Sequence, residues 1–187
     1  MTTDLKLAVI IASSRPQRVG PAVAEWMFAA TEDREHATYD LIDLAELELP
    51  NLDEPQPAAS QQYTHEHTKA WSAKVASYDG FIFVTPEYNR GIPGQLKNAL
   101  DFLYAEWNDK AAGIVCYGSS GGLRAAEALK QVLGELQVAT VRAQVSVSIF
   151  DDMQDYSVMT PRDFQARNVT TLLDQTERWA GALKTLR

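Results

Sequence analysis

The sequence predicts an α/β fold in which five parallel strands form a sheet covered by helices on both faces. Short apolar runs alternate with longer stretches of helical period along the whole chain, as in repeated βα units. Three of the five runs are apolar at almost every position, which is typical of strands buried on both faces. The other two runs carry polar residues and are therefore the expected edges of the sheet.

The strands are justified one by one from these runs. The first, third and fourth are almost wholly apolar, whereas the second contains Asp40 and Asp43. In the fifth, Val145, Val147 and Ile149 alternate with polar residues. The predicted strands cover residues 5–12, 39–44, 81–84, 111–117 and 143–150.

Placing the most apolar strands in the centre predicts the strand order 2-1-3-4-5, which is the flavodoxin-like winding. The order 3-2-1-4-5 would put the very apolar third strand at an edge. We therefore predict a flavodoxin-like three-layer sandwich. In such sheets ligands bind beyond the carboxyl ends of the strands, here between the first and third strands.

The stretches of helical period predict five helices. Residues 50–59 (PNLDEPQPAA) contain three prolines and form a loop. Residues 160–163 (Thr-Pro-Arg-Asp) resemble a capping box for the last helix. Phe164, Leu172, Trp179 and Leu183 are expected on one side of that helix. The predicted helices cover residues 20–31, 64–78, 92–107, 123–136 and about 160–186.

Composition narrows the class of protein. The 187 residues include 17 Lys+Arg and 25 Asp+Glu, for a net charge of −8, with 45% hydrophobic residues. These values are typical of a globular chain, and the length predicts a single domain over residues 1–187.

The charge and the cysteine content indicate what the protein does not bind. An acidic chain without a basic block is poorly suited to nucleic acid or to an anionic membrane surface. The apolar run over residues 5–12 is too short to span a bilayer. The single Cys116 excludes an internal disulfide and suits a reducing compartment. We expect a cytoplasmic protein without nucleic-acid or membrane partners.

The loop after the first strand, residues 13–20 (SSRPQRVG), combines hydroxyl groups, two guanidinium groups and the amides of a helix N-terminus. These groups suit a phosphate monoester. The loop is neither a Walker P-loop nor a G-x-G-x-x-G turn. The alternative is an ordinary loop with solvated arginines.

The loops after the third and fourth strands are also unusual. In residues 85–94 (TPEYNRGIPG), two prolines and two glycines restrict the backbone, and Tyr88 and Asn89 suit the edge and face of a planar heterocycle. The alternative is a rigid turn in which Tyr88 is a packing residue. In residues 117–123 (YGSSGGL), three glycines allow a ligand to approach the backbone. Such glycine-rich turns are common, so this motif indicates a ligand site only in combination with the other two loops.

Together, ASSRPQRVG, PEYNRGIPGQLKNALDFL and YGSSGGLRA resemble the NADPH-dependent FMN reductase family, which includes flavodoxin-like quinone, chromate and azo-dye reductases. The resemblance covers residues 5–148 in the right order. Ala12 stands where the family commonly has glycine, and we expect the loop to be retained because alanine is small.

The resemblance implies FMN as the cofactor and NADPH or NADH as the electron donor. It implies three groups of cofactor contacts, at the phosphate, the isoalloxazine ring and its pyrimidine side. These are Ser13, Arg15, Arg18, Val19 and Gly20 for the phosphate, Pro86, Glu87, Tyr88 and Asn89 for the ring, and Ser119, Gly121 and Gly122 for the pyrimidine side.

The implied reaction is ping-pong hydride transfer from nicotinamide to FMN N5, and then to a quinone, azo compound, flavin or other small electron acceptor. It requires no catalytic side chain and no metal. Two alternatives are a flavodoxin-type electron carrier without pyridine-nucleotide activity and a non-redox binder of a phosphate ligand. Arg90 and Arg124 are the candidates for the 2′-phosphate of NADPH.

The resemblance also implies a homodimer or a dimer of dimers. Tyr104 and Trp107 extend the apolar face of the helix over residues 96–107, so this helix is expected at the interface, with core packing as the alternative. Residues 151–156, an acidic segment on the ligand side of the sheet, form either a solvated loop or part of the substrate entrance.

Three smaller features are expected to be structural or solvated. Cys116 is a small core residue. Lys97 and Asp101 are four residues apart and pair on a helix surface. His65 and His67 belong to a solvated helix start rather than to a metal site.

Overall fold

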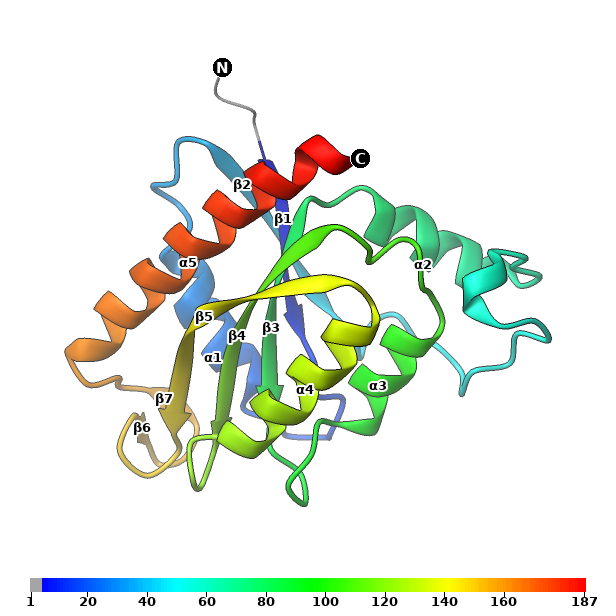
Figure 1. Cartoon of the computed structure of the whole chain (residues 1–187). Coiled ribbons are helices and arrows are strands. Elements are labelled where there is room, and N and C mark those ends of the chain that lie inside the picture. The colour runs from blue at the N-terminus through cyan, green and yellow to red at the C-terminus, as the bar shows by residue number, and fades with distance from the viewer. Residues whose placement is uncertain (1–4) are drawn as a thin grey trace.

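The strand order of the sheet is the predicted one. The computed structural model describes residues 5–187, in which five parallel strands have the order β2-β1-β3-β4-β5 (Figure 1). A small antiparallel hairpin follows the last of them. The strands are β1 (Leu5–Ile11), β2 (Ala37–Asp43), β3 (Gly80–Pro86), β4 (Lys110–Gly118) and β5 (Val138–Ser148), and the hairpin is formed by β6 (Met153–Gln154) and β7 (Val158–Met159).

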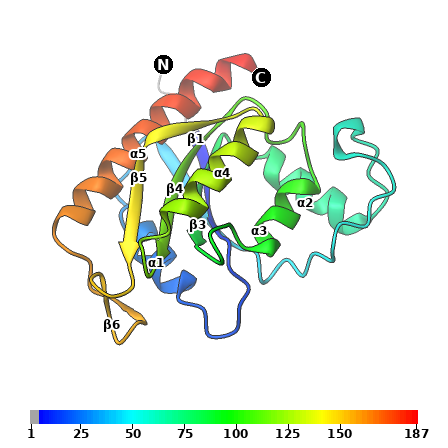
Figure 2. The ribbon, with the colours of Figure 1, turned by 60° about the horizontal axis from the view of Figure 1, so that its bottom comes forward.

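Helices cover both faces of the sheet and complete the three layers (Figures 1 and 2). Two helices pack on one face and three on the other. The first group is α1 (Gly20–Ala29) and α5 (Phe164–Leu183), and the second is α2 (Glu66–Ala76), α3 (Gly94–Asp101) and α4 (Leu123–Glu135). Short 3-10 turns cover Ala58–Ser60 and Lys184–Leu186.

Burial explains why these strands are central. Every residue of β3 is buried, and β1 and β4 have one residue each that is not. Burying a large aliphatic or aromatic side chain contributes about 1.5–3 kcal/mol, so these runs favour two-sided burial strongly. Because Pro86 of β3 pairs in register with Tyr117 of β4, the loops that follow these two strands start side by side.

The third helix differs from the prediction in its length and in the role of Trp107. The helix ends at Asp101 instead of residue 107. After it the chain turns back toward β4, and Trp107 is only 1% exposed, with its indole N–H donated to the Leu100 carbonyl (3.2 Å). Its ring packs edge-on against Phe81 at 4.9 Å between centroids. Trp107 is therefore a core residue, and the expectation that it extends an interface face is wrong.

The start of α5 also differs from the prediction. The residue before the helix is Asp163, whose side chain makes no capping hydrogen bond. Thr160 instead donates its backbone N–H to the Asp152 carbonyl (2.9 Å), so the predicted capping box is wrong. Phe164 and Trp179 are exposed, against expectation. The buried face of α5 is formed by Gln165, Val169, Leu172, Leu173, Thr176 and Ala180.

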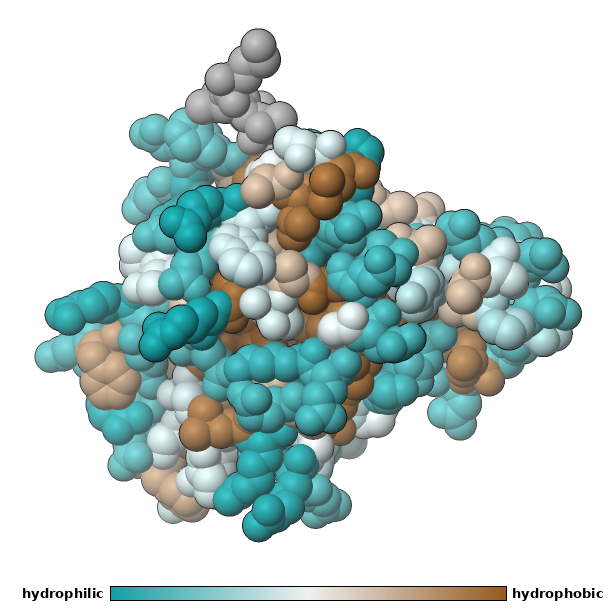
Figure 3. All heavy atoms as spheres, viewed as in Figure 1, coloured by the Kyte–Doolittle hydropathy of each residue, from teal (hydrophilic) through white to brown (hydrophobic). Residues whose placement is uncertain are grey.

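The face shown in Figure 3 is mostly hydrophilic, and hydrophobic residues are visible mainly in the furrows between the elements. Across residues 5–187, none of the helices combines the length and the apolar character needed to cross a bilayer.

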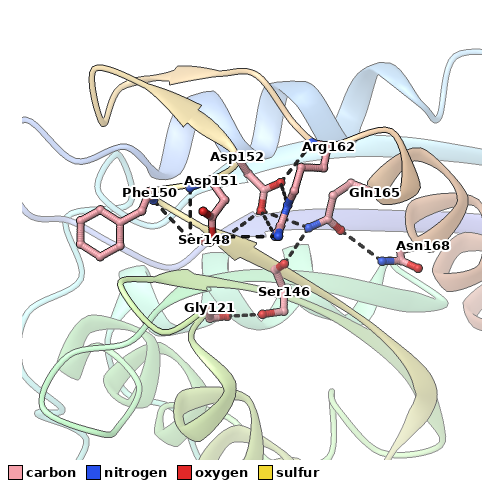
Figure 4. Close-up of polar contacts among 9 residues, drawn as sticks. All are labelled: Gly121, Ser146, Ser148, Phe150, Asp151, Asp152, Arg162, Gln165 and Asn168. Atoms are coloured by element: carbon pink, nitrogen blue, oxygen red, sulfur yellow. Dashed lines mark hydrogen bonds and ion pairs between the residues drawn. The ribbon is translucent and has the colours of Figure 1, made fainter.

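The segment between β5 and α5 is held by one buried carboxylate, that of Asp152 (Figure 4). It accepts hydrogen bonds from the Ser148 amide (2.9 Å), from Nε and Nη2 of Arg162 (both 2.9 Å) and from the Gln165 amide nitrogen (3.2 Å). Gln165 also donates to the Ser146 carbonyl (2.7 Å). The acidic segment is thus solvated at its other carboxylates, while Asp152 ties it to the sheet.

We predict that Asp152→Asn destabilises the fold by about 2 kcal/mol at neutral pH, because a charge-assisted network is broken. Burial opposes ionisation, but the hydrogen bonds from Arg162 and Ser148 outweigh it and lower the pKa of the Asp152 carboxyl to about 2. A lowered folded-state pKa gives stability that is present above the unfolded value of about 3.9 and is lost as the pH falls toward 2.

Urea unfolding as a function of pH measures this effect. The difference between wild type and Asp152→Asn should shrink between pH values of about 4 and 2, and exposed Asp151→Asn should change little. A difference that is independent of pH, or an equal loss in the Asp151 variant, would contradict the assignment.

Candidate active site

One pocket of about 320 Å³ opens at the carboxyl ends of the central strands, on the side that Figure 2 turns toward the viewer. Its volume is at the lower end of small-ligand sites. Each of the three predicted loops contributes to its wall. The predicted residues in the lining are Arg15, Val19, Pro86, Glu87, Tyr88 and Ser119, and the lining also contains Tyr117, Gly118, Ile149 and Tyr156.

A buried hydroxyl pair joins the first and second loops. Ser13 is fully buried, and its hydroxyl lies 2.7 Å from the Tyr88 hydroxyl. Ala12 is buried just before it and donates its amide to the Val84 carbonyl (3.0 Å), so the loop leaves β1 in register with β3. Ser13 therefore lies behind the pocket wall and positions Tyr88 within it.

The second loop is a tight hairpin. Tyr88 and Gly91 exchange two backbone hydrogen bonds of 3.0 Å, and between them Asn89 and Arg90 have φ values of 49° and 70°. Two left-handed residues in a two-residue loop define a type I′ turn, which is rigid. This turn presents the Tyr88 ring to the pocket, while Asn89 and Arg90 are exposed at its tip and lie outside the lining.

Left-handed glycines shape the third loop. Gly121 and Gly122 have φ values of 73° and 74°. A Cβ on Gly122 would lie 2.6 Å from the Tyr117 nitrogen, and one on Gly121 would lie 2.2 Å from the Ser146 hydroxyl oxygen. Both glycines are therefore needed to pack the loop onto β4 and β5, and Ser119 is the predicted residue of this loop that reaches the lining.

Glu87 links the second and third loops. Its amide donates to the Tyr117 carbonyl (3.1 Å), and its carboxylate accepts from the Arg124 amide (3.0 Å) and from Arg124 Nη1 (2.8 Å). The Arg124 guanidinium lowers the pKa of the Glu87 carboxyl. This carboxylate supplies the negative charge that a helix N-terminus favours, here that of α4.

The N-terminus of α1 has no such carboxylate, because among residues 5–187 no side chain caps it and its first turn has no acidic residue. A Cβ on Gly20 would lie 2.8 Å from the Tyr117 hydroxyl oxygen, so this hydroxyl lies against the first turn of α1. A helix start with this composition has an unbalanced partial positive charge and free amide donors. It is available to an anion from outside the chain.

Two buried polar atoms beside α1 have no hydrogen-bond partner among residues 5–187, namely the Tyr117 hydroxyl and Arg18 Nε. Burial raises the pKa of Tyr117, while the nearby Ser13 hydroxyl, Arg15 and Arg18 act in the opposite sense. Arg18 forms an ion pair through Nη2 with Asp43 of β2. Buried donors without partners are rare in native proteins, so these two atoms are candidates to contact a ligand.

The other features singled out by sequence lie away from this pocket. Cys116 is buried as predicted, and burial raises the pKa of its thiol to about 12. Lys97 and Asp101 form the predicted pair (2.6 Å). His67 contacts Asp53 (3.1 Å), and the described residues contain no group of three or more His, Cys, Asp or Glu able to hold a metal. A second hollow of about 350 Å³ lies at the outer edge of β5 and contains none of the predicted site residues.

Comparison with known proteins places this site in a family. The sequence model described as NADPH-dependent FMN reductase matches residues 5–152. The chain belongs to this family. It is therefore an oxidoreductase of the FMN- and NAD(P)H-dependent type.

Relatives agree with this assignment, and a solved structure shares the fold. An NAD(P)H-dependent FMN reductase of Schizosaccharomyces pombe is 40% identical over 158 residues, covering 83% of this chain and 79% of the relative. One of Saccharomyces cerevisiae is 35% identical over 148 residues, covering 73% and 78%. The flavoenzyme FerB, an NAD(P)H:(acceptor) oxidoreductase of Paracoccus denitrificans, has a similar fold, with a TM-score of 0.71, 20% identity and coverage of 93% and 98%.

Sequence reasoning missed four lining residues. Tyr117 and Gly118 are the first two residues of the third motif. The reasoning that predicted Ser119 as a site residue applies equally to them. Ile149 and Tyr156 follow β5, an edge strand, where the strand-order argument gives no reason to expect a ligand. The only signal for Tyr156 was its place in the acidic segment on the ligand side of the sheet.

We predict that Gly122→Ala destabilises the protein by several kcal/mol, because a Cβ there meets β4 backbone at a left-handed φ. Gly134→Ala, in α4, is the matched control, since a Cβ there meets nothing within 4 Å. It should stabilise by about 0.5–1 kcal/mol. Denaturant unfolding of the two variants compares them, and similar changes in both would contradict the packing described for the third loop.

Proposed function

We propose that this pocket binds FMN and that the protein transfers electrons from NAD(P)H to a small electron acceptor in a ping-pong reaction. The observation that carries the proposal is the uncapped start of α1 beside the partnerless Tyr117 hydroxyl and Arg18 Nε. These donors suit a phosphate, and the Tyr88 turn beside them suits a flat ring. When bound, FMN accepts hydride from the nicotinamide and passes the electrons to the second substrate.

The first loop holds the phosphate in this proposal. The Arg15 guanidinium lines the pocket and supplies a cation. Arg18 contacts both Asp43 and the phosphate in this proposal. Its Nη2 pairs with Asp43, and its Nε, which has no hydrogen-bond partner among residues 5–187, donates to the phosphate. Val19 and Gly20 complete the cradle, with the amides at the start of α1 as donors. Ser13 supports it from behind the pocket wall, through its contact with Tyr88.

The second and third loops hold the ring. Pro86, Glu87 and Tyr88 line one part of it, with Asn89 at the tip of their turn, outside the lining. Ser119 lines its pyrimidine side, and Gly121 and Gly122 shape the loop that carries Ser119. Amide donors at that side would stabilise negative charge on a bound ring. We assign no acid or base to the protein, because hydride transfer requires none, and no metal.

The second substrate is a small oxidant, and a quinone is the leading candidate. Quinone reductases of Pseudomonas putida and a probable NADPH:quinone oxidoreductase of rice are among the relatives, which supports an enzyme over an electron carrier. The balanced reaction is NAD(P)H + H⁺ + quinone → NAD(P)⁺ + hydroquinone. Arg124 is paired with Glu87, so Arg90, exposed on its turn, is the better candidate to bind a 2′-phosphate.

The family resemblance supports the assembly, and the single Cys116, which suits a reducing compartment, supports the location. We propose a homodimer or a dimer of dimers acting in the cytoplasm. Light scattering coupled to size-exclusion chromatography measures the assembly, and a monomer would contradict that part of the proposal.

Flavin binding tests the proposal directly. The protein should bind FMN with a flavin absorption spectrum, and Arg15→Ala and Arg18→Ala should each weaken binding by about ten- to a hundredfold, as expected for a charge-assisted contact. Arg167→Ala, exposed on α5, should leave the affinity unchanged. Fluorescence titration with FMN gives the dissociation constants, and failure of the wild type to bind FMN would overturn the proposal.

Asp43→Asn separates the two roles of Arg18. It removes the ion pair but leaves the guanidinium in place. If Arg18 binds phosphate, Asp43→Asn should bind FMN at least as tightly as the wild type. An equal loss in Arg18→Ala and Asp43→Asn would assign Arg18 to the fold only.

A further inference from the structure

The β6–β7 hairpin adds an aromatic wall to the pocket from outside the three loops. It follows β5 and carries Tyr156 at its turn, and both Ile149 and Tyr156 belong to the pocket lining. In Figures 1 and 2 the hairpin lies at the carboxyl end of the sheet, beside the end of β5. Part of the pocket wall is therefore formed by residues that are not among the implied cofactor contacts.

The conformation of Tyr156 is unusual for its size. Asp155 and Tyr156 have φ values of 50° and 54°, and the Ser157 amide closes the turn on the Gln154 carbonyl (3.1 Å). Such turns favour Asn-Gly, and a left-handed conformation costs a bulky residue about 1 kcal/mol. Tyr156 is also 61% exposed, so burial of its side chain offsets little of this conformational cost. Packing within the chain therefore does not account for a tyrosine at this position, whereas its place in the pocket lining allows the ring to contact a ligand.

Phe150 braces this ring. It is 60% exposed and packs edge-on against Tyr156, with 5.8 Å between centroids and an interplanar angle of 85°. The amides of Phe150 and Asp151 donate to the Ser148 hydroxyl (both 3.3 Å), as Figure 4 shows. Through Ser148 and Asp152, the base of the hairpin is tied to β5 and α5, so the aromatic pair has a defined position.

The charges around the ring select against anions. Asp151 and Asp155 are exposed on the same segment, and Arg162 is paired with Asp152 (2.9 Å) and lies 3.9 Å from Asp151. The cation of the lining, Arg15, is used by the phosphate in the proposed function. A ligand that contacts Tyr156 therefore meets an aromatic face with acidic neighbours, which disfavours negatively charged groups.

We propose that Tyr156 determines specificity for the second substrate, by stacking on the ring of an uncharged planar aromatic acceptor and thereby favouring it over small oxyanions. The inference rests on the proposed function and narrows its acceptor class. Aromatic pairs prefer offset-stacked or edge-on contacts and add affinity beyond their buried area. Because Tyr156 is exposed at the mouth of the pocket, it contacts the substrate that arrives after the cofactor is bound.

Tyr156→Gly tests the proposal without straining the turn, since glycine adopts a positive φ freely. In FMN-loaded protein it should raise KM for 1,4-naphthoquinone about tenfold, leave KM for chromate within twofold, and leave the affinity for FMN and the melting temperature undiminished. Val158→Ala, equally exposed on the same hairpin but outside the lining, should behave as wild type.

Binding without turnover supplies a second readout. In Tyr156→Trp, added 1,4-naphthoquinone should quench the new indole fluorescence with a saturable dissociation constant, and in Val158→Trp it should not. A naphthoquinone KM within twofold of wild type in Tyr156→Gly, parallel changes for both acceptors, or equal quenching at the two positions would overturn the inference while leaving FMN binding intact. Loss of FMN binding in the wild type would instead overturn the proposed function, and the inference with it.

Discussion

The parallel pairing of β3 with both β1 and β4 determines where the three loops of the pocket lie. Because these three strands are parallel neighbours, their carboxyl ends come together at one edge of the sheet. Short-range bonds then join the loops to one another, from Ser13 to Tyr88 and from Glu87 to Tyr117 and Arg124. The site is rigid because each loop is held by a neighbouring loop as well as by its own strand.

A second constraint comes from the helices that begin at this edge, because each N-terminus favours a negative charge. Asp152 anchors the approach to α5 and Glu87 caps α4, while Glu54 accepts the amides of Thr64 and His65 before α2. Among residues 5–187 the starts of α1 and α3 receive no carboxylate, and that of α1 lies beside Arg18 and the Tyr117 hydroxyl. In a chain with a net charge of −8, this leaves a small positive site where the phosphate is proposed.

Sequence alone predicted the sheet order and the three loops, since local apolar patterns report two-sided burial. It failed where tertiary packing overrides local pattern. Trp107 continues a helical period in sequence, yet the chain turns after Asp101 and buries it. Asp152 has the composition of a solvated residue but is buried by partners up to 13 positions away. Tyr156 enters the pocket through a hairpin after an edge strand, and its sequence signal was the acidic segment at residues 151–156 on the ligand side of the sheet.

A crystal structure of the protein with FMN is the most direct test of the central claim that three loops form one flavin site. We predict that the phosphate lies at the start of α1 within hydrogen-bond distance of Arg15 and the Tyr117 hydroxyl, with the ring between Tyr88 and Ser119. FMN bound elsewhere, such as in the hollow beside Arg142 at the outer edge of β5, would contradict the account.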